Sequence, residues 1–395
     1  MSVSSFALRP SRWRKCTEGE WSDWRWQLRN ALKDASTIAE CLGLSASRRA
    51  LLLELPFRHV LSPHVVALMS VDGVDGPLGR QFVAQPGELE LDAAASADPL
   101  NERAHMVTEL LLRRYRDRAL LYVTGQCAAH CRHCTRRRKV GRSCAAPRAQ
   151  QLQAALAYLR EHTELRELLI SGGDPLSLSN GRLRRLLSAL REIEHLEVLR
   201  LCTRMPSVLP QRIDAELCEL LDEYGPIWLM THFNHVSEAS VESEQALTRL
   251  RRSGVLLMNQ TVLLQGVNAT PEAIEALNRW MLRWGCRPYY LFQTDLVQGM
   301  GALRTPVRAG LEIMESLSAG VSGLCVPHLA VDLPGGGGKV RFAPTRLRGV
   351  RGRALLFEGV EGEQIAYEDV SASSARWCAR VMGVSQGVSG GAGND

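Results

Sequence analysis

The segment Cys127–Cys134 carries three cysteines in the order Cys-x3-Cys-x2-Cys and constrains the fold more than any other stretch of the chain. A fold that uses these thiols must hold them on one loop around a metal centre. Thiolates are the usual ligands of iron–sulfur clusters, and a cubane normally takes four, so three leave one iron open for chemistry. Zinc also accepts this spacing, with a fourth ligand from His130, His133 or Cys144. This segment alone leaves both interpretations open.

Short apolar runs alternate with amphipathic stretches from residue 119 onward. This α/β alternation predicts parallel strands joined by crossover helices, as in a partial TIM-like barrel of six βα units. Strands are expected at Ala119–Thr124, Glu167–Ile170, Leu196–Leu201, Ile227–Thr231, Val255–Gln260 and Tyr289–Gln293. Amphipathic helices are expected between or after them, at Gln150–Glu161, Gly181–Ile193, Asp214–Glu223, Val241–Ser253, Pro271–Trp284 and Pro306–Leu317. Unusual motifs stand at the ends of these strands, and barrel active sites form at the carboxyl ends, so one site is expected on that rim.

Changes in composition and in the spacing of apolar residues divide the chain into four parts. Residues 1–112 read as a helical region interrupted by prolines, and residues 113–339 as the barrel. Residues 340–385 predict a short α/β extension, with a hairpin from Ala354–Phe357 and Gln364–Tyr367 and a helix near Ala375–Met382. The Gly/Ser-rich tail, residues 386–395, is expected to be disordered.

Composition narrows the class of protein. With 395 residues, 45% of them hydrophobic and 23% charged, the chain can bury a sizeable core. We find no signal peptide and no apolar stretch of membrane-spanning length. Eleven cysteines in such a chain favour a reducing compartment, so we expect a cytoplasmic protein. The net charge of +6 is spread along the sequence rather than gathered in a stripe, which argues against nucleic acid as a partner.

Five blocks of sequence lie in the order and approximate spacing of one enzyme family. They are Tyr115–Gly141, Ser171–Pro175, Thr231–His235, Gln293–Asp295 and Asp332–Lys339. In these blocks the chain resembles the lysine 2,3-aminomutase family, whose members are radical S-adenosylmethionine (SAM) enzymes that also use pyridoxal 5′-phosphate (PLP). The resemblance runs from about residue 21 to about residue 369. It implies a radical SAM barrel and an isomerase that shifts an amino group from C2 to C3.

The resemblance also implies where the iron–sulfur cofactor and SAM bind. It assigns a [4Fe–4S] cluster to Cys127, Cys131 and Cys134, with SAM on the open iron. It assigns SAM contacts to Gly172, Gly173, Asp174, Thr203, His232, Asn234 and Gln260. Glycine suits a backbone that comes close to a ligand, although Gly-Gly-Asp-Pro alone is also ordinary turn chemistry. Reduction of the cluster would require an external one-electron reductant protein.

Lys339 follows four glycines in a chain that has only four lysines. The run is not a phosphate-binding P-loop, because Leu333 occupies the first glycine position and Val340 follows the lysine. The bland alternative is a flexible turn with a solvated lysine. In the family the matching lysine binds PLP covalently, which requires a neutral amine. Arg114 and Arg118 match the arginines beside the PLP phosphate, and the alternative for them is a surface pair.

Asp295 and Asp332 match the two carboxylates with which the family holds the distal ammonium of lysine. Arg136 matches the arginine that binds the α-carboxylate of the substrate. Together they imply L-lysine as substrate and L-β-lysine as product. Arginine, whose guanidinium also suits two carboxylates, is the alternative substrate. Two carboxylates would repel the side chain of glutamate.

The chain departs from the family at its structural zinc site. Family members often bind zinc at the subunit interface through C-terminal cysteines and one cysteine of the barrel. Here only Cys378 stands in the C-terminal stretch, and Thr270 occupies the barrel position. We therefore expect no structural zinc, and a homo-oligomer becomes less certain than in the family. A zinc-binding, basic nucleic-acid-associated protein is the alternative from a different class, but it would leave the rim motifs and Lys339 unexplained.

Overall fold

A computed structural model describes residues 2–55, 57–90, 92–141, 147–359 and 361–384. Cys144, considered above as a zinc ligand, and the tail 386–395 lie outside the described residues.

A nine-stranded sheet forms the centre of the molecule, with its strands side by side in the order of the sequence. Its strands are β1 (Leu111–Leu112), β2 (Arg118–Thr124), β3 (Glu167–Gly172), β4 (Val198–Cys202), β5 (Ile227–Thr231), β6 (Leu256–Val262), β7 (Arg287–Phe292), β8 (His328–Leu333) and β9 (Gly338–Arg341). Strands β2 to β8 are parallel, whereas β1 and β9 pair antiparallel at the two edges. The sheet is therefore an open half-barrel, and the six expected strands are confirmed.

The sequence analysis missed one parallel strand, β8, and the edge strand β9. The apolar part of β8 is short, and the run of glycines that follows it suggests a loop. Strand β9 has no apolar run at all and is a strand because it pairs with β8, with Asp332 directly opposite Lys339. The barrel thus has the six expected βα units, followed by a seventh parallel strand, β8. The domain boundaries drawn above stay predictions, although β9 continues past residue 339.

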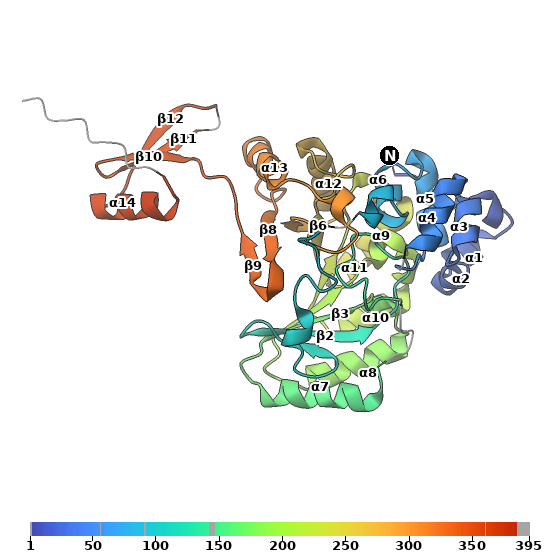
Figure 1. Cartoon of the computed structure of the whole chain (residues 1–395). Coiled ribbons are helices and arrows are strands. Elements are labelled where there is room, and N and C mark those ends of the chain that lie inside the picture. Colours follow the sequence, from blue (N-terminus) through green and yellow to red (C-terminus); the bar gives the residue numbers. More distant parts are fainter. Residues whose placement is uncertain (1, 56, 91, 142–146, 360, 385–395) are drawn as a thin grey trace, which may run out of the picture.

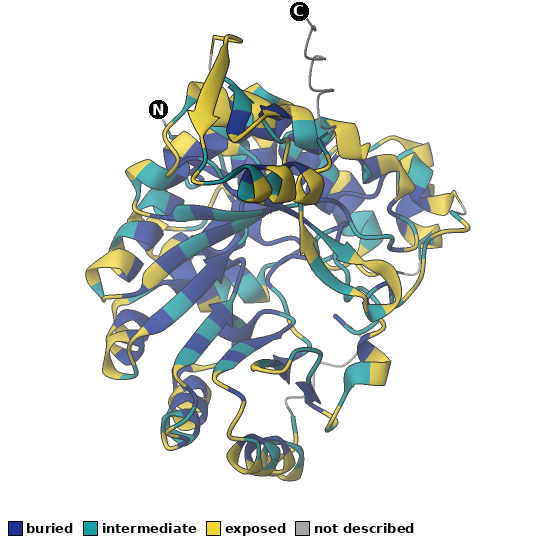
Figure 2. Cartoon of the chain, turned by 90° about the vertical axis from the view of Figure 1, so that its left-hand side faces the viewer, coloured by how far each residue is buried: buried dark blue, intermediate teal, exposed yellow. Residues whose placement is uncertain are grey.

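Crossover helices cover the outer face of the sheet (Figure 1). They are α7 (Ala149–Glu161), α8 (Asn180–Arg191), α10 (Ala215–Glu223), α11 (Val241–Arg252), α12 (Pro271–Arg283) and α13 (Val307–Gly320), with the single turn α9 (Met205–Val208) after β4. Each long helix turns its apolar side inward; the buried leucines of α8, for example, are Leu183, Leu186, Leu187 and Leu190. Figure 2 shows buried strands inside a shell of partly exposed helices.

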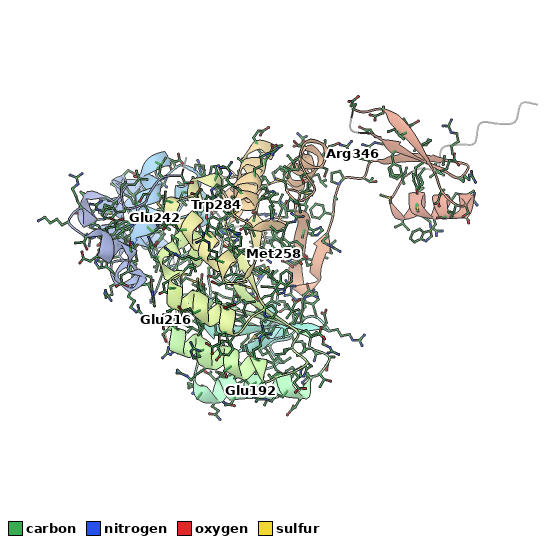
Figure 3. The ribbon with its side chains drawn as sticks, turned by 180° about the vertical axis from the view of Figure 1, so that it is seen from behind. Glu192, Glu216, Glu242, Met258, Trp284 and Arg346 are labelled. Carbon is green, nitrogen blue, oxygen red and sulfur yellow. The ribbon has the colours of Figure 1, made fainter. Side chains whose placement is uncertain are left out.

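The N-terminal region packs six helices against one side of the barrel (Figure 1). They are α1 (Glu18–Ser22), α2 (Trp24–Arg29), α3 (Ala35–Cys41), α4 (Ala46–Glu54), α5 (Pro63–Asp72) and α6 (Pro77–Phe82). Residues 63–69 of helix α5 are buried, and only its last turn is exposed. The first residues are also fixed, because the hydroxyls of Ser4 and Ser5 donate at 2.9 and 3.0 Å to Glu242 of α11, which is labelled in Figure 3.

One-turn 3₁₀ helices lie in the connections of the described chain. They are Ser11–Trp13, Pro86–Leu89, Glu102–His105, Pro175–Ser177, Pro210–Arg212, Val236–Glu238, Gly301–Leu303 and Pro334–Gly336.

A small C-terminal module follows β9 and stands apart from the barrel in Figure 1. It consists of β10 (Leu347–Arg351), β11 (Ala354–Glu358), β12 (Gln364–Glu368) and α14 (Ala372–Val381). The expected hairpin and helix are confirmed, and β10 is an addition. The module has a core of its own, formed by Leu347, Val350, Leu355, Ala375 and Ala379.

Candidate active site

A cavity of about 540 Å³ opens where the parallel strands end. All the residues that the sequence analysis assigned to a site line this cavity, with the exception of Asn234. The lining residues among them are Arg114, Arg118, Cys127, Cys131, Cys134, Arg136, Gly172, Gly173, Asp174, Thr203, His232, Gln260, Asp295, Asp332 and Lys339. Side chains from strands β2 to β9 and their loops therefore meet in one place, as the rim argument predicted.

The cysteine loop follows β2 and is held by the N-terminal region. The backbone N–H of His130 donates to the carbonyl of Val60 at 2.9 Å, and that of Arg132 donates to the carbonyl of Gln81 at 2.7 Å. Burial and the neighbouring Asp174 and thiols raise the pKa of Cys127, and burial with Cys131 raises the pKa of Cys134 to about 11. The protein alone thus disfavours thiolates here, and a positively charged metal centre would favour them.

A buried ion pair fixes the middle of the same loop. The guanidinium of Arg132, fully buried, donates from Nε to Glu88 Oε1 at 2.9 Å and from Nη2 to Oε2 at 2.5 Å. Arg137 adds a bond to Glu88 Oε2 at 2.9 Å. Losing one partner of such a pair leaves an uncompensated buried charge, which typically costs about 3–5 kcal/mol. The loop is therefore anchored by a carboxylate about 40 residues before it in the chain, beyond the reach of local sequence patterns.

The glycines after β3 are required by their neighbours in the protein. Gly172 has φ +126°, and a Cβ there would lie 2.4 Å from the carbonyl oxygen of Thr124. A Cβ on Gly173 would lie 2.3 Å from the carbonyl oxygen of Gln126. The glycines let the β3 turn dock against the start of the cysteine loop, where the N–H of Asp174 donates to Gln126 at 2.7 Å.

Asp174 is buried, and its carboxylate accepts hydrogen bonds from other groups of the protein. It accepts from the hydroxyl of Thr203 at 2.7 Å and from the backbone N–H groups of Leu176 and Arg204 at 3.0 and 2.7 Å. Burial raises the pKa of Asp174 despite these donors. Asp174 and Thr203 therefore join the ends of β3 and β4 beneath the cavity.

A pair of neutral histidines lies beside the cysteines. His232 Nδ1 is 2.6 Å from the carbonyl oxygen of Gln260, so Nδ1 carries the proton and Nε2 accepts from His133 Nε2, 2.9 Å away. Burial, together with Arg204, lowers the pKa of His232 to about 3 and that of His133 well below its ordinary value. Asn234, assigned to SAM above, lies beneath the cavity wall, and its amide donates to Gln81 Oε1 at 2.9 Å.

The histidines proposed as zinc ligands are engaged elsewhere. His130 faces away from the thiols: its Nδ1 is 2.9 Å from the carbonyl oxygen of Arg58, and its ring stacks on Phe57 at 5.5 Å. His133 is bonded to His232, as described above. In the described part of the chain, no three His, Cys, Asp or Glu side chains converge as they would around a single ion.

Arg136 is held in the cavity wall by groups that sequence analysis missed. Its Nε donates to Glu102 Oε1 at 2.8 Å and to the Tyr122 hydroxyl at 3.2 Å, and Nη1 donates to Ser171 at 3.3 Å. Burial alone would raise the pKa of Glu102, but Arg136 overcomes it and lowers the pKa to about 2. Nε and Nη1 make these bonds, whereas Nη2 makes no hydrogen bond to a described residue and is left for a carboxylate in the cavity.

Lys339 lies opposite Asp332 on the paired strands β9 and β8. Its Nζ donates to Asp332 Oδ2 at 2.9 Å and stands 3.7 Å from the centre of the Phe292 ring. Its backbone N–H donates to the hydroxyl of Tyr115 at 2.9 Å, and the guanidinium of Arg118 stacks on the same tyrosine at 3.8 Å. One tyrosine thus joins the segment of Arg114 and Arg118 to the strand of Lys339.

Asp295 stands close enough to Asp332 for the two charges to interact. Burial, and then the neighbouring carboxylate of Asp332, raise the pKa of Asp295 to about 7, although Lys339 opposes the shift. Near neutral pH the carboxyl of Asp295 is therefore only partly ionised. Two carboxylates that share a site commonly divide their charge in this way.

Thr270 and Cys378, the two positions compared above with the zinc site of the family, have structural roles. Thr270 is the N-cap of α12 and accepts from the backbone N–H of Ala273 at 3.3 Å. Cys378 lies on α14 and packs against the core of the C-terminal module.

Three comparisons with known proteins bear on the site. Residues 121–277 match the Radical SAM superfamily. The chain is 38% identical over 361 residues to the L-lysine 2,3-aminomutase of Methanococcus maripaludis, covering 90% of this chain and 83% of that protein. It is 36% identical over 356 residues to the glutamate 2,3-aminomutase of Clostridioides difficile, covering 89% and 84%. Among solved structures, a radical SAM coproporphyrinogen III oxidase of Escherichia coli aligns over 52% of both chains, with 17% identity and a TM-score of 0.36. In the described part of the chain, every helix is too short or too polar to span a bilayer.

Proposed function

The chain belongs to the lysine 2,3-aminomutase family of radical SAM enzymes, and from this premise we propose that it converts L-lysine to L-β-lysine with the help of PLP. Membership implies a [4Fe–4S] cluster and SAM. PLP, the identity of the substrate and the roles of single residues are parts of the proposal.

The donor set near β2 fits a cubane cluster. Cys127, Cys131 and Cys134 line one cavity, and the pKa values of Cys127 and Cys134, raised mainly by burial, are raised further by neighbouring thiols, so the three lie within electrostatic reach of each other. Three sulfurs leave one iron for SAM. We assign the contacts to SAM to the surrounding rim, through Gly172, Gly173, Asp174, Thr203, His232 and Gln260.

The other end of the cavity fits PLP. Lys339 would hold the aldehyde carbon of PLP, and Arg114 and Arg118 would hold its phosphate, for which the planar guanidinium is suited. Tyr115 supports both ends of this arrangement through Lys339 and Arg118. When bound, the cluster with SAM supplies hydrogen abstraction by a radical, and PLP supplies the aldehyde that takes up the migrating amino group.

One observation carries the choice of lysine. The carboxylate of Asp332 holds the ammonium of Lys339 at 2.9 Å over the face of Phe292. An ammonium on a four-carbon chain is also the distal end of free lysine, so this pocket suits it. Glutamate would bring a third carboxylate beside Asp295 and Asp332, which repulsion opposes. A guanidinium would have to fit where the aromatic ring and Asp332 already enclose a smaller cation.

Residues of the chain itself would bind the two ends of the substrate. Arg136, steadied by Glu102, would hold the α-carboxylate of lysine. Asp332 and Asp295 would hold the distal ammonium, and Asp332 is also the nearest acceptor for a proton that leaves Lys339. The substrate would thereby be held at both ends in the cavity, which positions C2 and C3.

We also propose that the protein acts in the cytoplasm. All ten cysteines that the structure describes are free thiols, which supports a reducing compartment such as the cytoplasm. The electron for the cluster would come from an external one-electron reductant protein.

The assignment is tested by anaerobic purification and reconstitution with iron, sulfide and PLP. The protein is then incubated with SAM, dithionite and lysine, arginine or glutamate, and the derivatised amino acids are separated by chromatography. We expect β-lysine only, and its complete loss in Lys339→Ala. Lys33→Ala, which removes an exposed lysine outside the cavity, is the matched control and should keep full activity.

Formation of β-arginine instead would retain the mechanism and contradict the assignment of the carboxylate pair. Cleavage of SAM without isomerisation of any of the three amino acids would contradict the proposed substrate class altogether.

A further inference from the structure

Arg204 lies directly after β4 and points its guanidinium at a cluster cysteine. Its Nη1 donates to the Sγ of Cys131 at 2.8 Å. The residue is only 7% exposed, and its guanidinium lies over the ring of Phe82, 4.5 Å from the centroid. Arg204 is therefore a charged donor in direct contact with a sulfur ligand.

Buried acceptors hold the far side of this guanidinium. Arg204 Nη2 donates to Glu238 Oε2 at 3.0 Å and to Gln81 Oε1 at 2.5 Å. Glu238 is 1% exposed and also accepts from the N–H of Asn234 at 2.8 Å and from the hydroxyl of Ser207. Asn234 in turn donates to Gln81. This network aims Nη1 at the sulfur and leaves Arg204 little freedom to turn toward another ligand.

We propose that Arg204 is a positioning residue that raises the reduction potential of the cluster through its hydrogen bond to the Cys131 sulfur. The inference rests on the proposed function in that it requires the cluster on Cys127, Cys131 and Cys134. It does not depend on the amino acid that the enzyme isomerises.

The physical reason is the charge that reduction adds. The cluster takes one electron from an external one-electron donor and passes from the 2+ to the 1+ state, and no bond is made or broken. Hydrogen bonds to the ligand sulfurs stabilise the more negative state, and they do so most strongly in a buried site of low dielectric constant. The negative charge of Glu238 cancels most of the positive charge of Arg204 at longer distances. The cluster would therefore be stabilised mainly by the N–H group that Arg204 directs at the sulfur of Cys131.

The test is a redox titration of reconstituted protein without any amino acid substrate. The EPR signal of the reduced cluster is followed against the solution potential, with dithionite as reductant. We expect Arg204→Met to lower the ratio of reduced to oxidised cluster at a fixed potential about tenfold, which for a one-electron couple is a shift of about 59 mV to lower potential. Arg204→Lys, which keeps the charge but cannot reach sulfur and Glu238 together, should lie between Met and wild type.

Arg200→Met is the matched control. Arg200 lines the same cavity but is bonded to Glu167 at 2.7 Å, so its removal deletes a nearby charge without a bond to sulfur. We expect a shift of less than about a third of that in Arg204→Met.

Three results would overturn the inference. The first is an Arg204→Met protein with full iron and sulfide content and an unchanged potential. The second is an equal shift in Arg200→Met. The third result applies if Arg204→Met loses the cluster. In that case an unchanged, wild-type potential in Arg204→Lys would overturn the inference. If Arg204→Met shifts the potential but the wild-type protein does not isomerise lysine, the inference about Arg204 stands and only the proposed substrate is contradicted.

Discussion

At the scale of single residues, the cavity is governed by charges that must find partners. Asp332 is paired with Lys339, whereas Asp295 has its pKa raised to about 7 by burial and by Asp332. Without a bound cationic substrate, the two carboxylates of this pocket therefore repel each other. Functional sites commonly store such unfavourable charge.

Asp295→Asn should stabilise the cofactor-free protein at high pH. The pKa of Asp295 is higher in the folded chain than in the unfolded one, so the folded state holds its proton more tightly. Stability is therefore lost as pH rises from about 4 to about 7, and the penalty is complete above that range. We expect the variant to exceed wild type by at least about 1 kcal/mol at pH 8 and by much less at pH 5, as measured by urea unfolding.

Asp75→Asn is the control for this prediction, because Asp75 is exposed and paired with Arg48 on the surface. Its effect should be small and the same at both pH values. An Asp295→Asn protein whose advantage does not grow between pH 5 and pH 8 would contradict the charge repulsion described for the pair.

Motif residues could be predicted from the sequence, whereas the residues that hold them could not. The three cysteines, Lys339 and the aspartates stand in recognisable blocks, and the structure brings them to one cavity. Glu88 and Glu102 belong to no motif, and each acts on arginines more than 30 residues away in the chain. Asn234, expected from the sequence to contact SAM, is not among the lining residues of the cavity and is hydrogen-bonded to Gln81 of the N-terminal region.

At the scale of elements, the ends of β2 and β3 are joined at the cysteine loop. The glycine turn after β3 packs against the backbone of Thr124 and Gln126, and Asp174 donates into that backbone. The geometry of the thiols therefore depends on a neighbouring strand as well as on their own loop. Strand β8 and its partner β9 were missed because their pairing, rather than their local composition, makes them strands.

Gly173→Ala should damage the cluster site and leave the rest of the barrel folded. The new Cβ would lie 2.3 Å from the carbonyl oxygen of Gln126, so the turn and the cysteine loop must move apart. Overpacking of this kind costs about 1–3 kcal/mol, and we expect at least about half of the bound iron to be lost after reconstitution. Iron analysis and the circular dichroism spectrum measure the two effects.

Gly301→Ala is the matched variant, because nothing lies within 4 Å of its added Cβ. It should bind iron as wild type does. Equal iron content in Gly173→Ala and wild type would contradict the docking of the turn against the loop.

At the scale of the whole molecule, the described C-terminal module has a hydrophobic core separate from the three clusters in the rest of the described chain. The large core joins the N-terminal helices to the barrel, whereas the C-terminal module packs on its own residues. Figure 3 shows Arg346, at the start of the module, well away from Met258 in the barrel. The module also exposes apolar side chains such as Tyr367 and Val370, at 63% and 91%. Homo-oligomerisation stays a prediction.

A chain that ends after Pro344 should keep the barrel intact. It retains β9 and Phe342, which packs against the barrel, and it loses only residues that have their own core. We expect its melting temperature to lie within about 2 °C of the full chain and its cluster content to be unchanged. Light scattering on both chains reports their oligomeric state at the same time. A fall of more than about 5 °C would contradict the independence of the module's core.

The supports of the cysteine loop have a consequence for the order of biosynthesis. Val60, Gln81 and Glu88 leave the ribosome before the cysteines that they hold, whereas Lys339 is among the last parts of the barrel to be made. Because chains fold from the N-terminus during translation, the cradle for the sulfur ligands begins to assemble while the lysine is still untranslated. Maturation of the iron end of the cavity can thus precede that of the lysine end on the nascent chain.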